Sequence, residues 1–430
     1  YLTPGFIDVN TDSDHYLTLF TNPVQQDFLL QGVTTIIGGQ CGSSLAPLLY
    51  GSLESVRKWG NINQVNVDWH TLHEFLKVLE RRGLGVNFGT LVGHSTIRRA
   101  LIGEVFRDLT LGELGVFKRL VNDSLKAGAL GLSTGLGYAH ARQVPYLEIK
   151  TLAQIVTEYQ GVYATHLRDE QEGLLASVGE TIKLARETGV KILISHFRPL
   201  LGFETDFEAS LKLLEKEGAG LDIQFDSYPS DTSLVPIYTL LPDWAKNGGL
   251  EVMLVNIETP HLREKILREL PALKENDIIV AQAPLAEYLA GKTLGQFSEN
   301  QELDLKQGLL KLMVITKMRA VVFYKNINMD LAIQSLSHPK ALVAYNSPSL
   351  VEAGAGAKHE RISNTFPRFL AIVTQTKMVS LENAVKKLTS LPAQKFNFPD
   401  RGEIKEGKFA DLTLIKDGKI TAVFVNGQLV

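Results

Sequence analysis

The chain has 430 residues, of which 44% are hydrophobic and 21% are charged, and its formal net charge at pH 7 is -3. This composition is ordinary for a globular protein, and the length suffices for one large α/β domain plus a smaller part. The small net charge gives no electrostatic reason to expect a nucleic acid or an anionic membrane as a partner. No apolar run approaches the roughly 18 residues of a membrane span. The single cysteine, Cys41, excludes an internal disulfide and is typical of a reducing compartment, so we predict a cytoplasmic protein.

Short apolar and β-branched segments alternate with helical patterns along most of the chain. The predicted strands cover residues 5–9, 33–37, 86–92, 129–132, 162–166, 191–196, 221–225 and 341–345. Eight strands that alternate with helices predict an α/β protein with a (β/α)8 barrel, known as a TIM barrel. A mixed region at about 240–338 follows the seventh strand, and we interpret it as an insertion over the site.

The end of the chain changes character. Residues 411–415 and 420–425 flank an Asp-Gly turn and predict a β-hairpin. An isolated hairpin is marginal in water, so this one needs partner strands. Because the chain begins at Tyr1 without a methionine, we expect that an N-terminal part is missing and that it supplies those partners.

Two predicted strands end in histidine. His166 ends the fifth strand and His196 the sixth, and the helix between them makes the two strands parallel. Both side chains therefore lie at the sheet edge where α/β folds build their sites. One histidine at a strand end is more often a core residue, but two at matching depth favour a shared site.

Cys41 follows the second strand in a glycine-rich segment, which places it at the same edge. A thiolate and two imidazoles form a ligand set that suits zinc, and they leave one position open for water. The alternative is that Cys41 is a small buried hydrophobe. We predict one tightly bound zinc ion, which would activate water and polarise a carbonyl oxygen.

Other strand-end residues are candidates for proton transfer or substrate binding. Amide hydrolysis needs a base, but Asn346 stands at the end of the eighth strand, and an amide does not take up a proton usefully. Arg198 and Tyr228 can bind a substrate carboxylate by charge and hydroxyl, or they have a surface role. Residues 168–170 either orient the metal ligands or form a solvated loop.

Motifs spread over nearly the whole chain carry a resemblance to a known family. They include PGFID at 4–8, GVTT at 32–35, GLSTGL at 131–136, YATHLRDE at 163–170, ISH at 194–196, LPDW at 241–244, TFPR at 365–368 and TSLPA at 389–393. With these motifs the sequence resembles the D-aminoacylase (N-acyl-D-amino-acid deacylase) group of the amidohydrolase superfamily. The resemblance implies a TIM barrel with a small β-sandwich built from both chain ends. We accordingly expect a barrel domain at 1–395 and a hairpin at 396–430 that forms part of the sandwich.

The resemblance also implies roles for single residues. Cys41, His166 and His196 match the ligands of the family's tightly held zinc. The His-x-His pair of the first strand, which serves a second metal position, is replaced by Asn10 and Asp12. Asp12 can still ligate zinc through oxygen and is a candidate substitute base.

The substrate-binding positions and the catalytic position match the family unevenly. Asn346 stands where the family has its catalytic aspartate. Arg198, in place of the usual lysine, and Tyr228 fit the positions that bind the substrate carboxylate, and Ser233 is a candidate for a further contact.

Two functions of different classes follow from these residues. The leading hypothesis is a zinc-dependent hydrolase of a non-peptide carbon–nitrogen bond, similar to N-acyl-D-amino-acid deacylases but with an altered site. Its partner would be a small molecule, an N-acylated amino acid, and neither nucleic acid nor membrane. The alternative is a catalytically inactive homologue that binds a ligand or acts as a subunit of an assembly.

Overall fold

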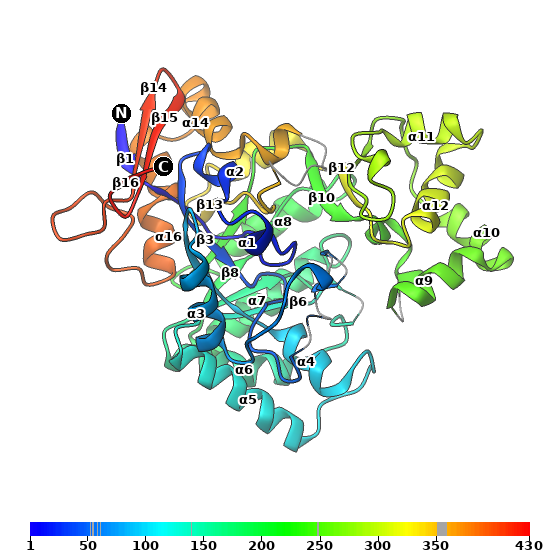
Figure 1. Ribbon diagram of the computed structural model, residues 1–430, viewed down its shortest axis with the longest axis horizontal. Helices are drawn as coiled ribbons and strands as arrows, with labels where there is room; N and C mark the ends of the chain where they lie inside the picture. Colours follow the sequence, from blue (N-terminus) through cyan, green and yellow to red (C-terminus); the bar gives the residue numbers. More distant parts are fainter. Residues whose placement is uncertain are drawn as a thin grey trace.

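A ring of parallel strands forms the centre of the protein (Figure 1). The computed structural model describes residues 1–430 except 52, 54, 55, 58, 61, 139, 247, 248 and 351–358. The strands of the ring are β2 (Phe6–Asp8), β3 (Val33–Gly38), β4 (Asn87–Thr90), β5 (Val92–Gly93), β6 (Gly131–Gly135), β7 (Val162–His166), β8 (Lys191–Ile194), β9 (Ile223–Ser227) and β13 (Ala341–Val343). The predicted α/β class with a (β/α)8 barrel is confirmed.

The ring consists of two sheets, with the strand orders β2-β3-β4 and β13-β9-β8-β7-β6-β5. Backbone hydrogen bonds join the two sheets. Leu91 separates β4 from β5, and its N–H donates to the carbonyl of Gly38 at 3.0 Å, so β4 and β5 act as one barrel strand. On the other side, the N–H of Asn346 donates to the carbonyl of Asn10 at 2.9 Å. The barrel is therefore closed around its whole circumference.

β2 and β13 are shorter than the sequence predicts because a buried carboxylate replaces part of their pairing. The side chain of Asp8 accepts hydrogen bonds from the N–H groups of Asn10 and Tyr345, each at 3.0 Å. Burial raises the pKa of Asp8 well above its usual value, although these two hydrogen bonds lower it. The two strand ends are thus held together by a side chain rather than by a strand ladder.

Helices cover the outside of the barrel. They are α1 (Thr18–Thr21), α2 (Gln26–Leu29), α3 (Leu72–Arg82), α4 (His94–Ile102), α5 (Leu111–Lys126), α6 (Tyr146–Glu158), α7 (Leu174–Thr188), α8 (Glu204–Lys216), α13 (Met329–Ser335), α14 (Thr365–Thr376), α15 (Leu381–Leu388) and α16 (Ser390–Lys395). α3 and α5 each begin with a capping box, in which Thr71 or Thr110 pairs with a glutamate three residues later. Within the described residues, no helix is long and apolar enough to cross a membrane.

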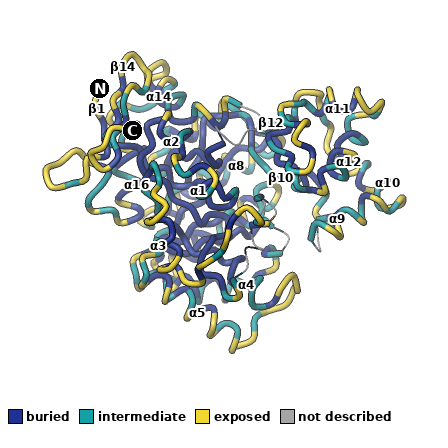
Figure 2. The backbone as a smooth tube through the Cα atoms, viewed as in Figure 1, coloured by how far each residue is buried: buried dark blue, intermediate teal, exposed yellow. Residues whose placement is uncertain are grey.

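The segment between β9 and α13 forms a lobe beside the barrel, on the right in Figure 1. Its antiparallel sheet has the order β10 (Thr232–Pro236), β12 (Val321–Lys325) and β11 (Ile278–Gln282). Its helical elements are η3 (Ile237–Leu240), η4 (Asp243–Lys246), α9 (Gly249–Glu258), α10 (Pro260–Glu269), η5 (Glu287–Leu289), α11 (Leu294–Asn300) and α12 (Leu305–Ile315). The lobe has a hydrophobic core of its own, which Figure 2 shows as buried backbone inside an exposed rim. Its sheet begins before the predicted insertion at 240–338.

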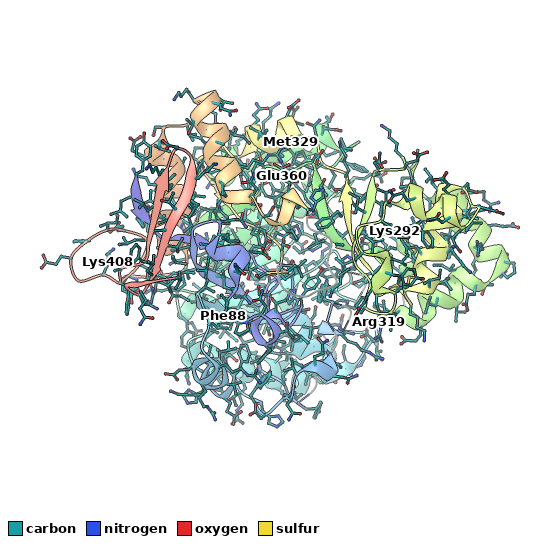
Figure 3. The ribbon with its side chains drawn as sticks, turned by 45° about the horizontal axis from the view of Figure 1, so that its top comes forward. Phe88, Lys292, Arg319, Met329, Glu360 and Lys408 are labelled. Atoms are coloured by element: carbon teal, nitrogen blue, oxygen red, sulfur yellow. The ribbon has the colours of Figure 1, made fainter. Side chains whose placement is uncertain are left out.

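Both termini meet in a four-stranded sheet on the side of the barrel away from the lobe (Figure 1). The order is β1 (Leu2–Pro4), β14 (Leu412–Lys416), β15 (Lys419–Val425) and β16 (Gln428–Leu429). In Figure 3, Lys408 marks this side, and Lys292 and Arg319 mark the lobe. The predicted hairpin is present, and β1 pairs with β14, so part of the expected partner sequence lies within this chain. The domain bounds at 395 and 396 stay a prediction.

A glycine at the start of β6 provides a test of the barrel packing. Gly131 has φ +152°, and an added Cβ would overlap the carbonyl oxygen of Val162 on β7. We expect Gly131→Ala to lower the free energy of unfolding by more than about 2 kcal/mol, because it adds both backbone strain and a steric overlap. Chemical denaturation measures the change.

The control is Gly115→Ala, in the exposed part of α5, where an added Cβ has open space. Alanine has the higher helix propensity, so this variant should be more stable by about 0.5–1 kcal/mol. Equal stabilities of the two variants would contradict the packing described for β6 and β7.

Candidate active site

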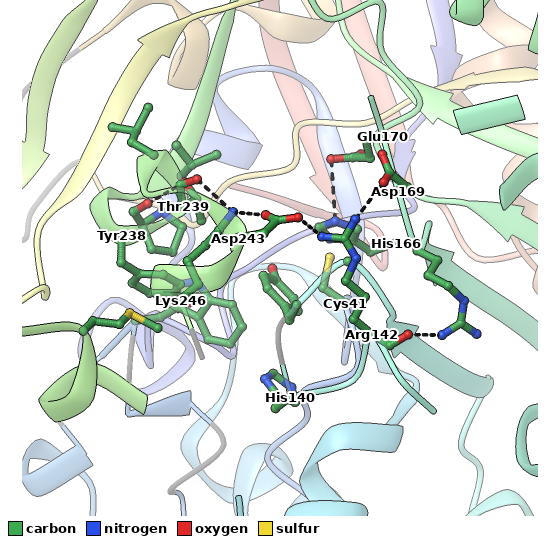
Figure 4. Close-up of a pocket in the computed structure, with 18 of the residues that line it drawn as sticks. Cys41, His140, Arg142, His166, Asp169, Glu170, Tyr238, Thr239, Asp243 and Lys246 are labelled. Carbon is green, nitrogen blue, oxygen red and sulfur yellow. Dashed lines mark hydrogen bonds and ion pairs between the residues drawn. The ribbon is translucent and has the colours of Figure 1, made fainter. Parts of the chain in front are cut away.

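A cavity of about 780 Å³ lies between the carboxyl ends of the barrel strands and the lobe (Figure 4). The barrel supplies the floor of this cavity, and η3, η4 and the β10–β12 pair supply part of its wall. The predicted site residues that line it are Asp12, Cys41, His166, His196, Arg198 and Asn346. Tyr228 and Ser233 lie immediately behind Arg198 and hydrogen-bond to it.

The three predicted zinc ligands come together on the cavity floor. Cys41 Sγ lies 3.4 Å from Nε2 of His196, and the rings of His166 and His196 meet edge to face, with centroids 4.5 Å apart. Ligand atoms of all three residues lie within 4.8 Å of one another. Tetrahedral zinc with bonds of about 2.0–2.3 Å needs donors about 3.5 Å apart. The donor types and their spacing therefore fit a zinc ion.

Unusual backbone conformations direct these side chains inward. Cys41 has φ +51°, His196 has φ +40° and Asn346 has φ +46°, so all three adopt the left-handed region. This region costs a residue other than glycine of order 1–3 kcal/mol, and it persists where the surrounding structure imposes it. Each residue stands where the chain turns away from the end of a barrel strand. The strain thus occurs at the strand ends that form the site.

Glu170 connects the metal-ligand candidates to the substrate-binding candidates. Its Oε1 lies 2.9 Å from Nδ1 of His196, and its Oε2 lies 3.6 Å from Nε2 of His166 and 3.2 Å from Nη2 of Arg198. Burial acts to raise the pKa of Glu170, but Arg198 and the two histidines outweigh it and hold that pKa well below its usual range. A carboxylate on the far nitrogen of a ligating histidine fixes the ring orientation. The sequence left open whether this loop was solvated, and the structure places Glu170 inside the site.

Two asparagines and an aspartate form a hydrogen-bonded chain at the edge of the site. Asn346 Nδ2 donates to Oδ1 of Asn10 at 3.3 Å, and Asn10 Nδ2 donates to both carboxylate oxygens of Asp226 at 3.2 and 3.3 Å. Asp226 also accepts the N–H of His196 at 2.8 Å, and burial raises its pKa to about 6. Sequence reasoning assigned no role to Asp226. It supports the turn that carries His196.

Asp12 lines the cavity, but it is not among the three residues whose ligand atoms cluster. Its Oδ1 lies 3.3 Å from Nδ1 of His15, whose Nε2 faces the carbonyl of Ser43 at 2.9 Å. Both ring nitrogens of His15 thus face acceptors. Burial acts to lower the pKa of His15, but Asp14 and Asp12 outweigh it and raise it to about 9. Asp12 and His15 therefore form a pair that holds a proton beside the cavity.

Arg198 hydrogen-bonds to the other two predicted substrate-binding residues. Its Nη1 donates to the Tyr228 hydroxyl at 3.1 Å and to Ser233 Oγ at 3.0 Å. The guanidinium of Arg361 lies over the ring of Tyr228, with Cζ 3.6 Å from the ring centroid. Burial acts to raise the pKa of Tyr228, but Arg198 and Arg361 outweigh it and lower it to about 8. This cluster has the charge and the hydroxyls to receive a carboxylate.

An ion-pair bridge links the cavity rim to the lobe, as Figure 4 shows. Arg142, in the loop after β6, pairs with Asp169 at 2.8 Å and also with Asp243 of η4. Asp243 in turn pairs with Lys246 at 2.8 Å. The bridge joins two barrel loops to the lobe across the opening of the cavity.

Comparisons with known proteins agree with this fold. Residues 345–430 match the model of the amidohydrolase family. The chain is 28% identical to the D-aminoacylase of Alcaligenes xylosoxydans xylosoxydans over 98% of this chain and 80% of that protein. It is 25% identical to the N-acyl-D-aspartate deacylase of the same organism, over 100% of this chain and 82% of that protein.

A solved structure shares the fold over the whole length of the chain. It is the N-acyl-D-glutamate deacylase of Bordetella bronchiseptica, in complex with zinc and a phosphonate inhibitor. The TM-score is 0.79 at 23% identity, over 100% of this chain and 85% of that one. The chain is therefore similar to the D-aminoacylase group of the amidohydrolase superfamily. These relatives agree with the sequence-based expectation of a hydrolase acting on carbon–nitrogen bonds.

The lowered pKa of Tyr228 gives a test of the Arg198 cluster. We expect one tyrosine to ionise at about pH 8, and this step in the ultraviolet difference absorbance should be absent in Tyr228→Phe. A tyrosine in the unfolded chain ionises at pH ~10. Ionisation of Tyr228 in the folded state therefore adds to the free energy of unfolding as the pH rises through 8. This contribution is complete above pH ~10 and is lost as the pH falls back through 8.

The control is Tyr163→Phe in β7. Burial raises the pKa of Tyr163 to about 12, so its removal should leave the step at pH 8 unchanged. A titration without that step in the unmodified protein would contradict the described position of Tyr228 between two arginines.

Proposed function

We propose that this chain is a zinc-dependent hydrolase that cleaves the non-peptide carbon–nitrogen bond of an N-acyl amino acid. The observation that carries the proposal is the cluster of Cys41, His166 and His196, whose ligand atoms lie within 4.8 Å of one another on a cavity floor. The D-aminoacylase and deacylase relatives support the reaction class. One tightly bound zinc ion is proposed for each chain.

The surrounding residues have separate tasks in this proposal. Zinc bound by the three side chains would supply Lewis acidity, which activates water and polarises a carbonyl. Glu170 holds the imidazole of His196 through Nδ1 and so orients it. Arg198 receives the substrate carboxylate at the cavity, and its hydrogen bonds to Tyr228 and Ser233 hold the guanidinium in place.

Asp12 is proposed as the group that takes the proton from water and returns it to the leaving nitrogen. It lines the cavity, and its carboxylate contacts the ring of His15, which can hold a proton. Asn346 has no proton to exchange, and its amide donates to Asn10. In this proposal Asn346 supports the wall of the site, and the altered site uses the carboxylate of Asp12 from the loop after β2.

A second candidate is a catalytically inactive homologue that binds a ligand or acts as a subunit. The observation that favours it is the chain of Asn346, Asn10 and Asp226, in which amides stand at the positions of the family's metal ligand and catalytic acid. Such a protein would keep the carboxylate-binding cluster of Arg198 and would bind N-acyl amino acids without hydrolysing them.

Metal content tests the first step of the leading proposal. We expect about one zinc per chain in the purified protein, because the three donors fit a catalytic zinc site that has three protein ligands and one open position. Cys41→Ala and His196→Ala should each lose most of that zinc. Elemental analysis after dialysis against a weak chelator measures it.

The matched control for metal content is His140→Ala. His140 lines the same cavity but does not belong to the cluster, so its variant should retain zinc. A protein that binds no metal at all, or whose His140 variant loses zinc like the others, would contradict the proposed ligand set.

The proton-transfer role is tested with Asp12→Asn and Asn346→Asp. We expect Asp12→Asn to lower kcat by roughly 10²–10⁴ while zinc content and substrate binding persist, because it removes the base but keeps the shape. Asn346→Asp should not reduce kcat below the unmodified level. Steady-state kinetics on N-acetyl-D-amino acids measure both. Binding without turnover in the unmodified protein, and turnover only in Asn346→Asp, would support the inactive homologue instead.

A further inference from the structure

We propose that Glu170 is a positioning residue that couples two binding events, so that zinc at the proposed metal cluster and a substrate carboxylate at Arg198 each strengthen the binding of the other. This inference rests on the proposed function, because it takes the metal and the carboxylate to bind at these two places. It adds a thermodynamic link between them and assigns that link to one side chain.

The two carboxylate oxygens of Glu170 are divided between the two binding places. Oε1 lies 2.9 Å from Nδ1 of His196, and Oε2 accepts a hydrogen bond from Nη2 of Arg198 at 3.2 Å. Oε2 also lies 3.6 Å from Nε2 of His166, and Figure 4 shows Glu170 beside that histidine. One carboxylate therefore contacts two of the three proposed metal ligands and the proposed carboxylate-binding group at the same time.

His196 directs its two ring nitrogens to different partners. Nδ1 faces Glu170, and Nε2 faces Sγ of Cys41 at 3.4 Å. A hydrogen bond donated from Nδ1 to a carboxylate leaves Nε2 as the metal-binding nitrogen and raises its basicity. The strength of the contact with Glu170 therefore affects how well His196 binds a cation.

Arg198 is held on the same short segment as His196. The two residues lie two positions apart after β8, and Phe197 between them packs on Phe207 of α8, with ring centroids 4.7 Å apart. The side chain of Arg198 is 9% exposed and that of Glu170 is 17% exposed. Charges so far from solvent are weakly screened, so a change at Arg198 is transmitted to Glu170.

The charges determine the direction of the coupling. A substrate carboxylate at Arg198 neutralises part of the guanidinium charge, and Glu170 then attracts the two histidines more strongly. More negative charge beside the histidines favours a cation at the metal cluster. By thermodynamic reciprocity, a cation at that cluster favours the carboxylate at Arg198 by the same factor.

The coupling is measured on the full chain with zinc and propionate as the two ligands. Propionate carries a carboxylate but no amide bond, so it is not hydrolysed. Competition with a chromophoric chelator gives the Kd for zinc with and without saturating propionate, at ionic strength matched with sodium chloride. We expect propionate to tighten zinc binding by at least about 5-fold, the lower end of ordinary coupling between two sites. An unchanged Kd would overturn the inference, and so would a chain that binds neither ligand or only one.

Glu170→Gln tests the assignment of the coupling to this side chain. A glutamine has one acceptor oxygen, so it accepts from His196 or from Arg198 but not from both. We expect the variant to bind zinc roughly 10–100-fold more weakly and to lose most of the coupling. If it does not fold, as judged by circular dichroism, Glu170→Asp provides the same test, because its shorter side chain reaches only one of the two partners. A folded variant that keeps the coupling would contradict the assignment.

Glu172→Gln is the matched control. Glu172 is an exposed carboxylate two residues further along the same loop, and it also lines the cavity. Its variant removes the same charge but leaves the contacts of Glu170 intact, so the zinc affinity and the coupling should stay at the unmodified values. Equal losses in the two variants would show that net charge at the cavity, rather than the contacts of Glu170, links the two ligands.

Arg198→Gln tests where propionate binds. This variant should abolish the coupling, because it removes the charge that receives the carboxylate. A coupling that persists would show that propionate binds the zinc directly, and this result would overturn the inference.

The two proposals fail in different ways. Coupled binding of zinc and propionate by a chain that hydrolyses no N-acyl amino acid would contradict the proposed function and leave the coupling standing. Hydrolysis together with independent binding of zinc and propionate would do the reverse.

Discussion

The rest of the site depends on the contacts of the largely buried Glu170 carboxylate with His166, His196 and Arg198. It touches the two histidines of the proposed metal cluster and the arginine of the proposed substrate cluster, with its closest contact at 2.9 Å to His196. A buried anion is costly unless several partners share its charge, and here three cationic or proton-donating groups surround it. The metal ligands and the carboxylate-binding group are thereby held in one rigid arrangement. A change at either cluster is felt by the other through this single side chain.

The amide-rich edge of the site is held together by hydrogen bonds of two asparagines around one carboxylate. Carboxylates and imidazoles at Asn10 and Asn346 would each need a proton or a metal to balance them. The amides instead bond to each other and to Asp226, which in turn supports the backbone of His196. The chemistry available on this side is therefore reduced, while the geometry of the remaining cluster is retained. Asp12, in the loop after β2 and paired with His15, is an ionisable side chain that lines the cavity.

The lobe forms part of the wall of the cavity. Its sheet places Val235 and Tyr324 at the cavity, and Asp243 reaches across the opening to Arg142. The lobe has its own hydrophobic core, so its packing does not depend on the barrel strands. Lobe residues at the cavity can differ without disturbing the cluster on the barrel floor.

The sequence by itself determined the barrel, the strand-end positions of Cys41, His166 and His196, and the terminal hairpin. These follow from local rules, because strand periodicity, strand-end chemistry and Asp-Gly turns are readable within a few residues. Only the tertiary structure decided the roles of Glu170, Asp226 and His15. Their respective partners His196, Asn10 and Ser43 lie 26, 216 and 28 positions away in the chain. The bounds of the lobe were likewise decided by tertiary pairing, since β10 joins β12 rather than its neighbours in sequence. Burial and long-range contact, which no local pattern encodes, made that difference.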